Sequence, residues 1–80
     1  MESQKHQDLK INKVAKEILL DYMLGGFKLD GFDSNISLDQ DIIYLIKDSK
    51  NKSELKIVKD YVTNEIRVYK NKMLNNVIKL

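Results

Sequence analysis

The sequence predicts an all-α domain of three helices, with a long C-terminal helix as its spine. Two observations carry this prediction. Apolar residues recur at every third or fourth position along three segments, and stretches of Gly, Asp, Ser and Asn separate those segments. We expect helices at about 8–24, 38–48 and 53–78, in one domain that spans 8–80 and follows a polar tail at 1–7.

The first helix has a continuous apolar stripe, and charged residues fill most of its other positions. The stripe consists of Ile11, Val14, Ala15, Ile18, Leu19 and Tyr22. Gly25 and Gly26 follow the segment directly. Glycine is the residue that most readily takes the left-handed conformation at a helix end, so we expect the helix to stop there.

The second helix is predicted from a start signal and the residues behind it. Residues 27–36 contain Gly31 among Asp, Ser and Asn residues, which favours a loop. Ser37 and Gln40 then have the spacing of a capping box, in which each side chain satisfies a free backbone N–H. Apolar residues gather on one side of the helix that would follow, namely Leu38, Ile42, Ile43, Leu45 and Ile46.

The third helix is predicted from an apolar stripe that runs without interruption over 26 residues. The stripe consists of Leu55, Val58, Val62, Ile66, Tyr69, Met73, Val77 and Leu80. A rise of about 1.5 Å per residue would make this helix roughly 40 Å long.

An α+β fold is the alternative, with the N-terminal helix followed by a small antiparallel meander or barrel. Several residues of 57–68 are β-branched and therefore mediocre helix formers. Residues 59–68 also fit a hairpin in which Asp60 opens the turn and Asn64 takes the left-handed position. The helical stripe favours the helix, because strand-like alternation fails at Val58 and Lys59.

Composition restricts the possible functions. The chain of 80 residues has no cysteine and a single histidine, His6, so disulfides and a zinc site of His and Cys are excluded. The longest apolar run, 42–46, is far too short to span a membrane, and the polar N-terminus does not resemble a secretion signal. We expect a cytoplasmic protein without membrane contact. Because so short a chain builds a marginal core, we also expect self-association to stabilise it.

The net charge of +2 is unevenly distributed, from −4 over 21–41 to +5 over 42–80. Arg67 is the one arginine among 14 basic residues, which together with abundant Ile and Asn suggests the AT-rich genome of a low-GC bacterium, a phage or a mobile element. The only histidine, His6, lies in the polar N-terminal tail, where we expect disorder, and no phosphate-binding glycine motif occurs. A calcium loop starting at Asp33 would place Leu38 where glycine is required. We therefore expect no enzyme activity, no metal and no cofactor.

The C-terminal segment is the strongest candidate for a binding surface. If it is helical, apolar side chains point to two of its sides, and a helix of this kind needs cover on both. The candidate partner-binding residues are Tyr69, Met73, Leu74, Val77, Ile78 and Leu80. This pattern predicts a non-enzymatic regulatory or adaptor protein that acts by protein contact through an apolar C-terminal helix, with a second copy as the expected partner in a homodimer.

Nucleic-acid binding is the alternative function. Basic residues cluster in the last two predicted helices, where contacts with phosphates would give a salt-dependent affinity. The candidate residues are Lys50, Lys52, Lys56, Lys59, Arg67 and Lys70. Nearby acidic residues, Glu54, Asp60 and Glu65, would oppose such contacts.

Overall fold

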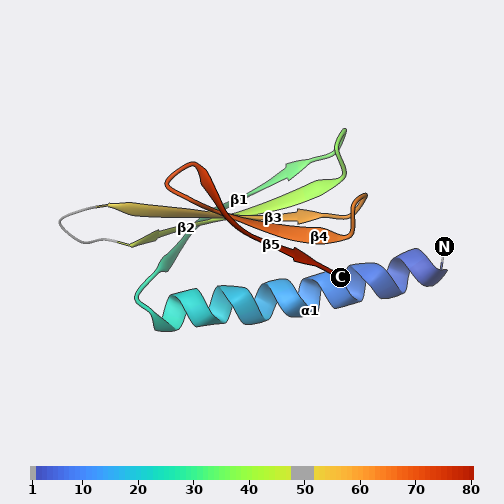
Figure 1. The fold of residues 1–80 in the computed structure, drawn as a ribbon, viewed down its shortest axis with the longest axis horizontal. Helices are drawn as coiled ribbons and strands as arrows, with labels where there is room; N and C mark the ends of the chain where they lie inside the picture. The colour runs from blue at the N-terminus through green and yellow to red at the C-terminus, as the bar shows by residue number, and fades with distance from the viewer. Residues whose placement is uncertain (1, 48–51) are drawn as a thin grey trace.

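The fold is one helix followed by a five-stranded antiparallel sheet. A computed structural model describes residues 2–47 and 52–80. The elements are α1 (Glu2–Leu24), β1 (Lys28–Asn35), β2 (Gln40–Lys47), β3 (Ser53–Asp60), β4 (Glu65–Lys70) and β5 (Met73–Lys79). Each strand pairs with the next, in the order β1-β2-β3-β4-β5. α1 lies along one side of this meander (Figure 1).

The all-α prediction is wrong, and the α+β alternative describes the chain. Residues 38–48, expected as the second helix, contain β2, and 53–78, expected as the third helix, contain β3, β4 and most of β5. The apparent helical stripe does not lie on one surface. Leu55 and Val58 sit three positions apart in the same strand and therefore point to opposite faces of the sheet, and Val62 is exposed in a turn.

Strand alternation sorts the side chains of the sheet into two faces. The helix face carries the core residues Ile43, Leu45, Leu55, Ile57, Ile66 and Val68, which cluster with Ile11 and Ala15 of α1. The opposite face, which we call the open face, carries Ile42, Tyr44, Lys56, Val58, Asp60, Arg67 and Tyr69. Val58 is buried although it points away from α1, so the central strand is covered on both sides.

The first helix was predicted correctly in its apolar face and in its end, but it begins earlier, at Glu2 rather than near residue 8. Ile11 and Ala15 are its most buried side chains. Gly26 has a φ of 104°, and the Phe27 N–H donates to the Tyr22 carbonyl at 3.1 Å, which closes the helix end. The rings of Tyr22 and Phe27 pack edge to face at 5.7 Å, so the chain leaves the helix in a defined direction.

Two four-residue turns share one design. In each, an Asn or Asp at the strand end accepts hydrogen bonds from turn residues, and the last turn residue has a positive φ. In the β1–β2 turn, the Asn35 side chain accepts from the Leu38 N–H at 3.3 Å, and Asp39 has φ 53°. In the β3–β4 turn, the Asp60 side chain accepts from the Val62 N–H at 3.0 Å, and Asn64 has φ 58°. Ser37 also bonds to Asn35, at 2.9 Å, so its predicted capping box is wrong and the segment is a β-turn.

The β4–β5 turn consists of two residues that both have positive φ, Asn71 at 52° and Lys72 at 69°. This is the geometry of a type I′ turn, whose twist matches that of the paired strands. Asn71 is held by β3, because its N–H donates to the Glu54 carbonyl at 2.9 Å and its side-chain oxygen accepts from the Glu54 N–H at 3.0 Å. Lys72 occupies a position where glycine is far more favourable.

Replacing Lys72 with glycine is expected to raise the free energy of unfolding by about 1 kcal/mol, because glycine adopts the left-handed conformation without a steric penalty. Thermal or urea denaturation measures the change. Lys72→Ala is the matched control, since it removes the same side chain but keeps the penalty. Equal stability of the two variants would show that the backbone conformation is not the cause.

Candidate functional site

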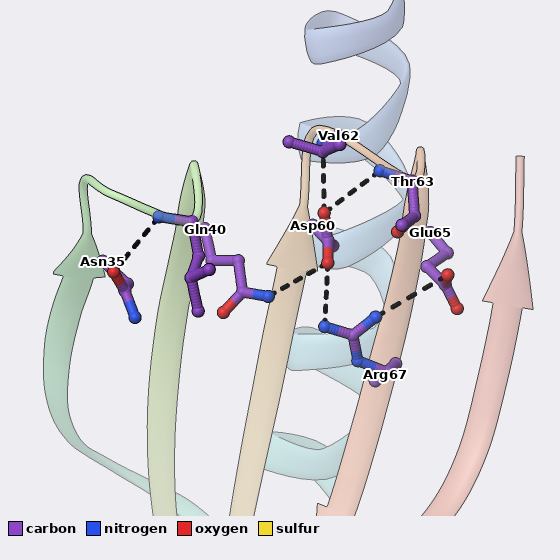
Figure 2. Close-up of polar contacts among 8 residues, drawn as sticks. Asn35, Gln40, Asp60, Val62, Thr63, Glu65 and Arg67 are labelled. Carbon is purple, nitrogen blue, oxygen red and sulfur yellow. Dashed lines mark hydrogen bonds and ion pairs between the residues drawn. The ribbon is translucent and has the colours of Figure 1, made fainter.

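A buried carboxylate organises the open face beside the β3–β4 turn. Asp60 is 5% exposed and accepts four hydrogen bonds (Figure 2). Two come from the backbone N–H groups of Val62 and Thr63, at 3.0 and 3.1 Å. The other two come from Gln40 Nε2 at 3.0 Å and Arg67 NH2 at 2.9 Å. The cluster therefore joins β2, β3, β4 and the turn.

The Asp60 cluster is suited to holding structure and not to proton transfer. Burial disfavours the carboxylate, but the hydrogen bonds from Thr63, Gln40, Arg67 and Val62 outweigh it and lower the pKa of Asp60 to about 2. Both carboxylate oxygens already have donors. A general base needs a raised pKa and a free lone pair directed at a substrate, and Asp60 offers neither.

A second polar cluster fastens α1 to the helix face. The Tyr61 hydroxyl, which has a single proton to donate, lies 2.8 Å from a carboxylate oxygen of Asp41 and 3.3 Å from the side-chain oxygen of Asn12 in α1. Lys59 Nζ donates to the same Asn12 oxygen at 3.0 Å. Burial opposes ionisation of Asp41, but the hydrogen bonds from Tyr61 and Ser34 and the charge of Lys59 lower its pKa. These groups satisfy one another, and no group of three or more metal-ligating side chains occurs in 2–47 and 52–80.

The structure does not bring the predicted nucleic-acid residues onto one surface. Lys50 lies outside the described residues. Register places Lys56 and Arg67 on the open face, but Lys59 and Lys70 on the helix face, and Lys52 precedes β3. Arg67 is also paired, with Asp60 at 2.9 Å and with Glu65 at 3.6 Å, as Figure 2 shows.

A hollow of about 320 Å³ lies near the other end of the open face. Its lining consists of Tyr44, Glu54, Leu55, Lys56, Tyr69 and Lys72. Lys56 Nζ lies 4.7 Å from the centre of the Tyr69 ring, so this ammonium already has an aromatic partner. Glu54 and Lys72 bring opposite charges to the same hollow.

The predicted partner-binding residues divide into two groups. Ile78 and Leu80 pack against the core on the helix face, so this chain itself covers them. Met73, Leu74 and Val77 of β5 are 74%, 55% and 37% exposed. Tyr69, on the neighbouring strand, is half-buried and shares the open face with Leu74 and Val77.

The two edges of the sheet differ in how far they are protected against pairing. β1 carries Lys28, Asp30 and Asp33, and an irregularity beside Gly31 interrupts its register with β2. Charged residues and bulges are the usual means of blocking an edge strand. β5 also has an irregular register with its neighbour β4, beside Tyr69, but it carries no charged residue from Met73 to Ile78, so the two edges differ in charge. Sequence reasoning found the apolar residues of β5 but assigned them to a helix, and therefore missed that they lie on a sheet edge.

Comparison of the chain with protein-family models, with curated proteins and with solved structures found no match. Within the part of the chain that the structure describes, no helix combines the length and hydropathy needed to cross a bilayer.

Proposed function

We propose that this chain is a small non-enzymatic regulatory or adaptor protein that binds another protein through β5 and the apolar side chains beside it. A cytoplasmic location, which the absence of cysteine favours, belongs to the same proposal. The predicted C-terminal helix is replaced here by an edge strand. The observation that carries the proposal is the contrast between the edges. β1 bears charges along its length, whereas β5 exposes apolar side chains and has no charged residue before Lys79 at its end.

The mode of contact that fits this edge is strand addition. A partner strand would hydrogen-bond to the free backbone groups of β5, which supplies affinity without requiring a particular sequence. Leu74 and Val77 lie on the open face and would pack against alternate side chains of the partner strand, which supplies specificity. Nucleic-acid binding has less support, because the candidate lysines lie on both faces and Arg67 is paired with acidic residues.

The proposal is tested by placing a charge on the edge. We expect Leu74→Lys and Val77→Lys each to weaken association with protein partners by about tenfold or more, because a charged side chain on an edge strand opposes the docking of another strand. Val62→Lys is the matched control, because it introduces the same charge at an exposed turn residue away from β5. Association is measured by light scattering of the purified chain and by capture from native host extract.

Point variants are preferable to truncation after residue 70. Truncation would remove the whole of β5, which pairs with β4 over its length, and would expose the core at Ile66 and Val68. A charged β5 variant that keeps the circular dichroism of the wild type and also keeps every association of the wild type would contradict the proposal.

A further inference from the structure

We propose that the partner of β5 is a second copy of this chain, and that the two β5 strands pair antiparallel about a two-fold axis perpendicular to the sheet. This inference rests on the proposed function and specifies its partner. It assigns Leu74 of one copy to a position opposite Val77 of the other. Three features of β5 lead to this register: its free backbone groups, its bulge and the order of its side chains.

The free backbone groups of β5 follow from its pairing with β4. In an antiparallel pair, residues whose N–H and C=O groups point toward the partner alternate with residues whose groups point away. The Leu80 N–H donates to the Asn64 carbonyl at 3.1 Å, so the backbone groups of Leu80 point toward the neighbouring chain segment. Because the direction alternates from residue to residue, the backbone groups of Val77, three positions earlier, point away from β4. At the other end, Met73 flanks a two-residue turn and pairs inward with Lys70, which turns the groups of Leu74 outward.

The bulge sets an unusual spacing between these free groups. Tyr69 pairs with Leu74 and Val68 with Asn76, so Asn75 is an extra residue in β5. Outward groups recur every two residues in a regular strand, but here they are separated by three positions, from Leu74 to Val77. A regular strand cannot match both. A second β5 in the proposed register can, because its own Val77 and Leu74 have the same spacing in the opposite direction.

The side chains agree with the same register. Residues 73–78 read Met-Leu-Asn-Asn-Val-Ile, two apolar residues on either side of two asparagines. Antiparallel pairing about their centre sets Leu74 against Val77 on the open face and Met73 against Ile78 on the helix face. A two-fold axis perpendicular to the sheet keeps each face on its own side. The match depends on the bulge, because without it Leu74 and Val77 would point to opposite faces.

Assembly through β5 would also stop at the dimer. Its outer edges would be the two β1 strands, which carry the charged residues Lys28, Asp30 and Asp33. Such edges resist further strand addition, so growth ends at two copies instead of continuing into a fibre. Both α1 helices would lie on the same side of a ten-stranded sheet, and the open faces would join into one surface.

The register brings Lys72 of one copy close to Lys79 of the other at both ends of the interface. Like charges that face each other across a strand pair are unfavourable, and salt screens them. We therefore expect self-association to strengthen as the salt concentration rises. Binding to nucleic acid would weaken over the same range, because it depends on phosphate contacts.

Cross-linking tests the register, and the absence of native cysteine gives a clean background. Opposed residues of an antiparallel pair have Cα atoms about 5.5 Å apart, within disulfide range. Copies of Leu74 are offset by three positions, roughly 10 Å along the strand, which is out of range. We expect an equimolar mixture of Leu74→Cys and Val77→Cys chains to form a covalent dimer on mild oxidation, and each variant alone to form none.

Sedimentation of the full chain provides the second measurement. We expect a concentration-dependent dimer that Leu74→Lys weakens by about tenfold or more, while Val62→Lys leaves it unchanged. Cross-linking of the Leu74→Cys chain with itself would overturn the register. A wild-type chain that stays monomeric at all salt concentrations would overturn the dimer. In that case, loss of partner capture by Leu74→Lys would still support the proposed function, and unchanged capture would reject both.

Discussion

Replacing Asp60 with alanine is expected to lower the free energy of unfolding by about 3 kcal/mol, the lower end of the cost of breaking a buried ion pair by removing one partner. The variant loses the acceptor for two turn N–H groups, for Gln40 and for Arg67. Arg67 loses its shortest ion pair and keeps the longer contact with Glu65, at 3.6 Å. Urea denaturation at neutral pH measures the effect.

Asp60→Asn is the matched control for this substitution. Asparagine keeps a side-chain oxygen that can accept from the Val62 and Thr63 N–H groups, but it loses the charge that attracts Arg67. Its cost should lie between zero and that of alanine. If asparagine and alanine cost the same, the charge carries the stabilisation and the turn hydrogen bonds contribute little. If Asp60→Ala lowers the free energy of unfolding by less than about 1 kcal/mol, the Asp60 cluster does not stabilise the fold as proposed.

The same carboxylate predicts a dependence of stability on pH. The pKa of Asp60 is lowered from 3.8 to about 2 in the folded chain, so the unfolded chain binds a proton more readily. The stabilisation is therefore complete above about pH 5 and is lost as the pH falls through about 2, with a total of about 2 kcal/mol. Asp60→Asn lacks this titration, so the stability difference between wild type and variant should shrink over the same range.

Replacing Ile11 with alanine is expected to lower the free energy of unfolding by about 3 kcal/mol. Ile11 is 0% exposed and belongs to the cluster that α1 shares with the helix face. Truncation removes buried methyl groups and leaves a cavity that the rigid sheet cannot fill. Leu9→Ala is the matched control, because Leu9 lies on the same helix but is 62% exposed.

Chemical denaturation of the two alanine variants separates packing from helix propensity. Both substitutions place alanine, a strong helix former, in α1, so neither should destabilise the helix itself. We expect Leu9→Ala to change stability by less than about 0.5 kcal/mol. A comparable loss in both variants would mean that α1 is held by a broad surface contact instead of by the buried Ile11.

The sequence by itself determined the parts of this protein that depend on local chemistry. The stripe of Ile11 and Ala15 predicted the buried face of α1, and Gly26 predicted its end, because both signals act within one or two turns of helix. The β3–β4 turn was also recognisable. The Asp60 and Asn64 pattern stood in the alternative reading, and both residues occupy the positions that it assigned to them.

Tertiary structure alone decided whether 38–80 is helix or sheet. Apolar side chains of short strands joined by short turns fall at spacings of three and four along the chain, which is also the spacing of a helical stripe. Leu55, Val58 and Ile66 fit that spacing, although Val58 lies on the opposite face of the sheet from the other two. Backbone pairing between β2, β3 and β4 joins residues that are distant in the sequence, so the residues of a short segment do not predict it.

Tertiary structure also decided where the exposed apolar residues of β5 lie. Alternation along a regular strand would separate Leu74 from Val77, and the bulge at Asn75, visible only once β4 and β5 are paired, brings them to one face. Apolar content and turn chemistry can be read from consecutive residues. Register, edges and faces depend on contacts between residues far apart in the chain, and they exist only when the sheet has formed.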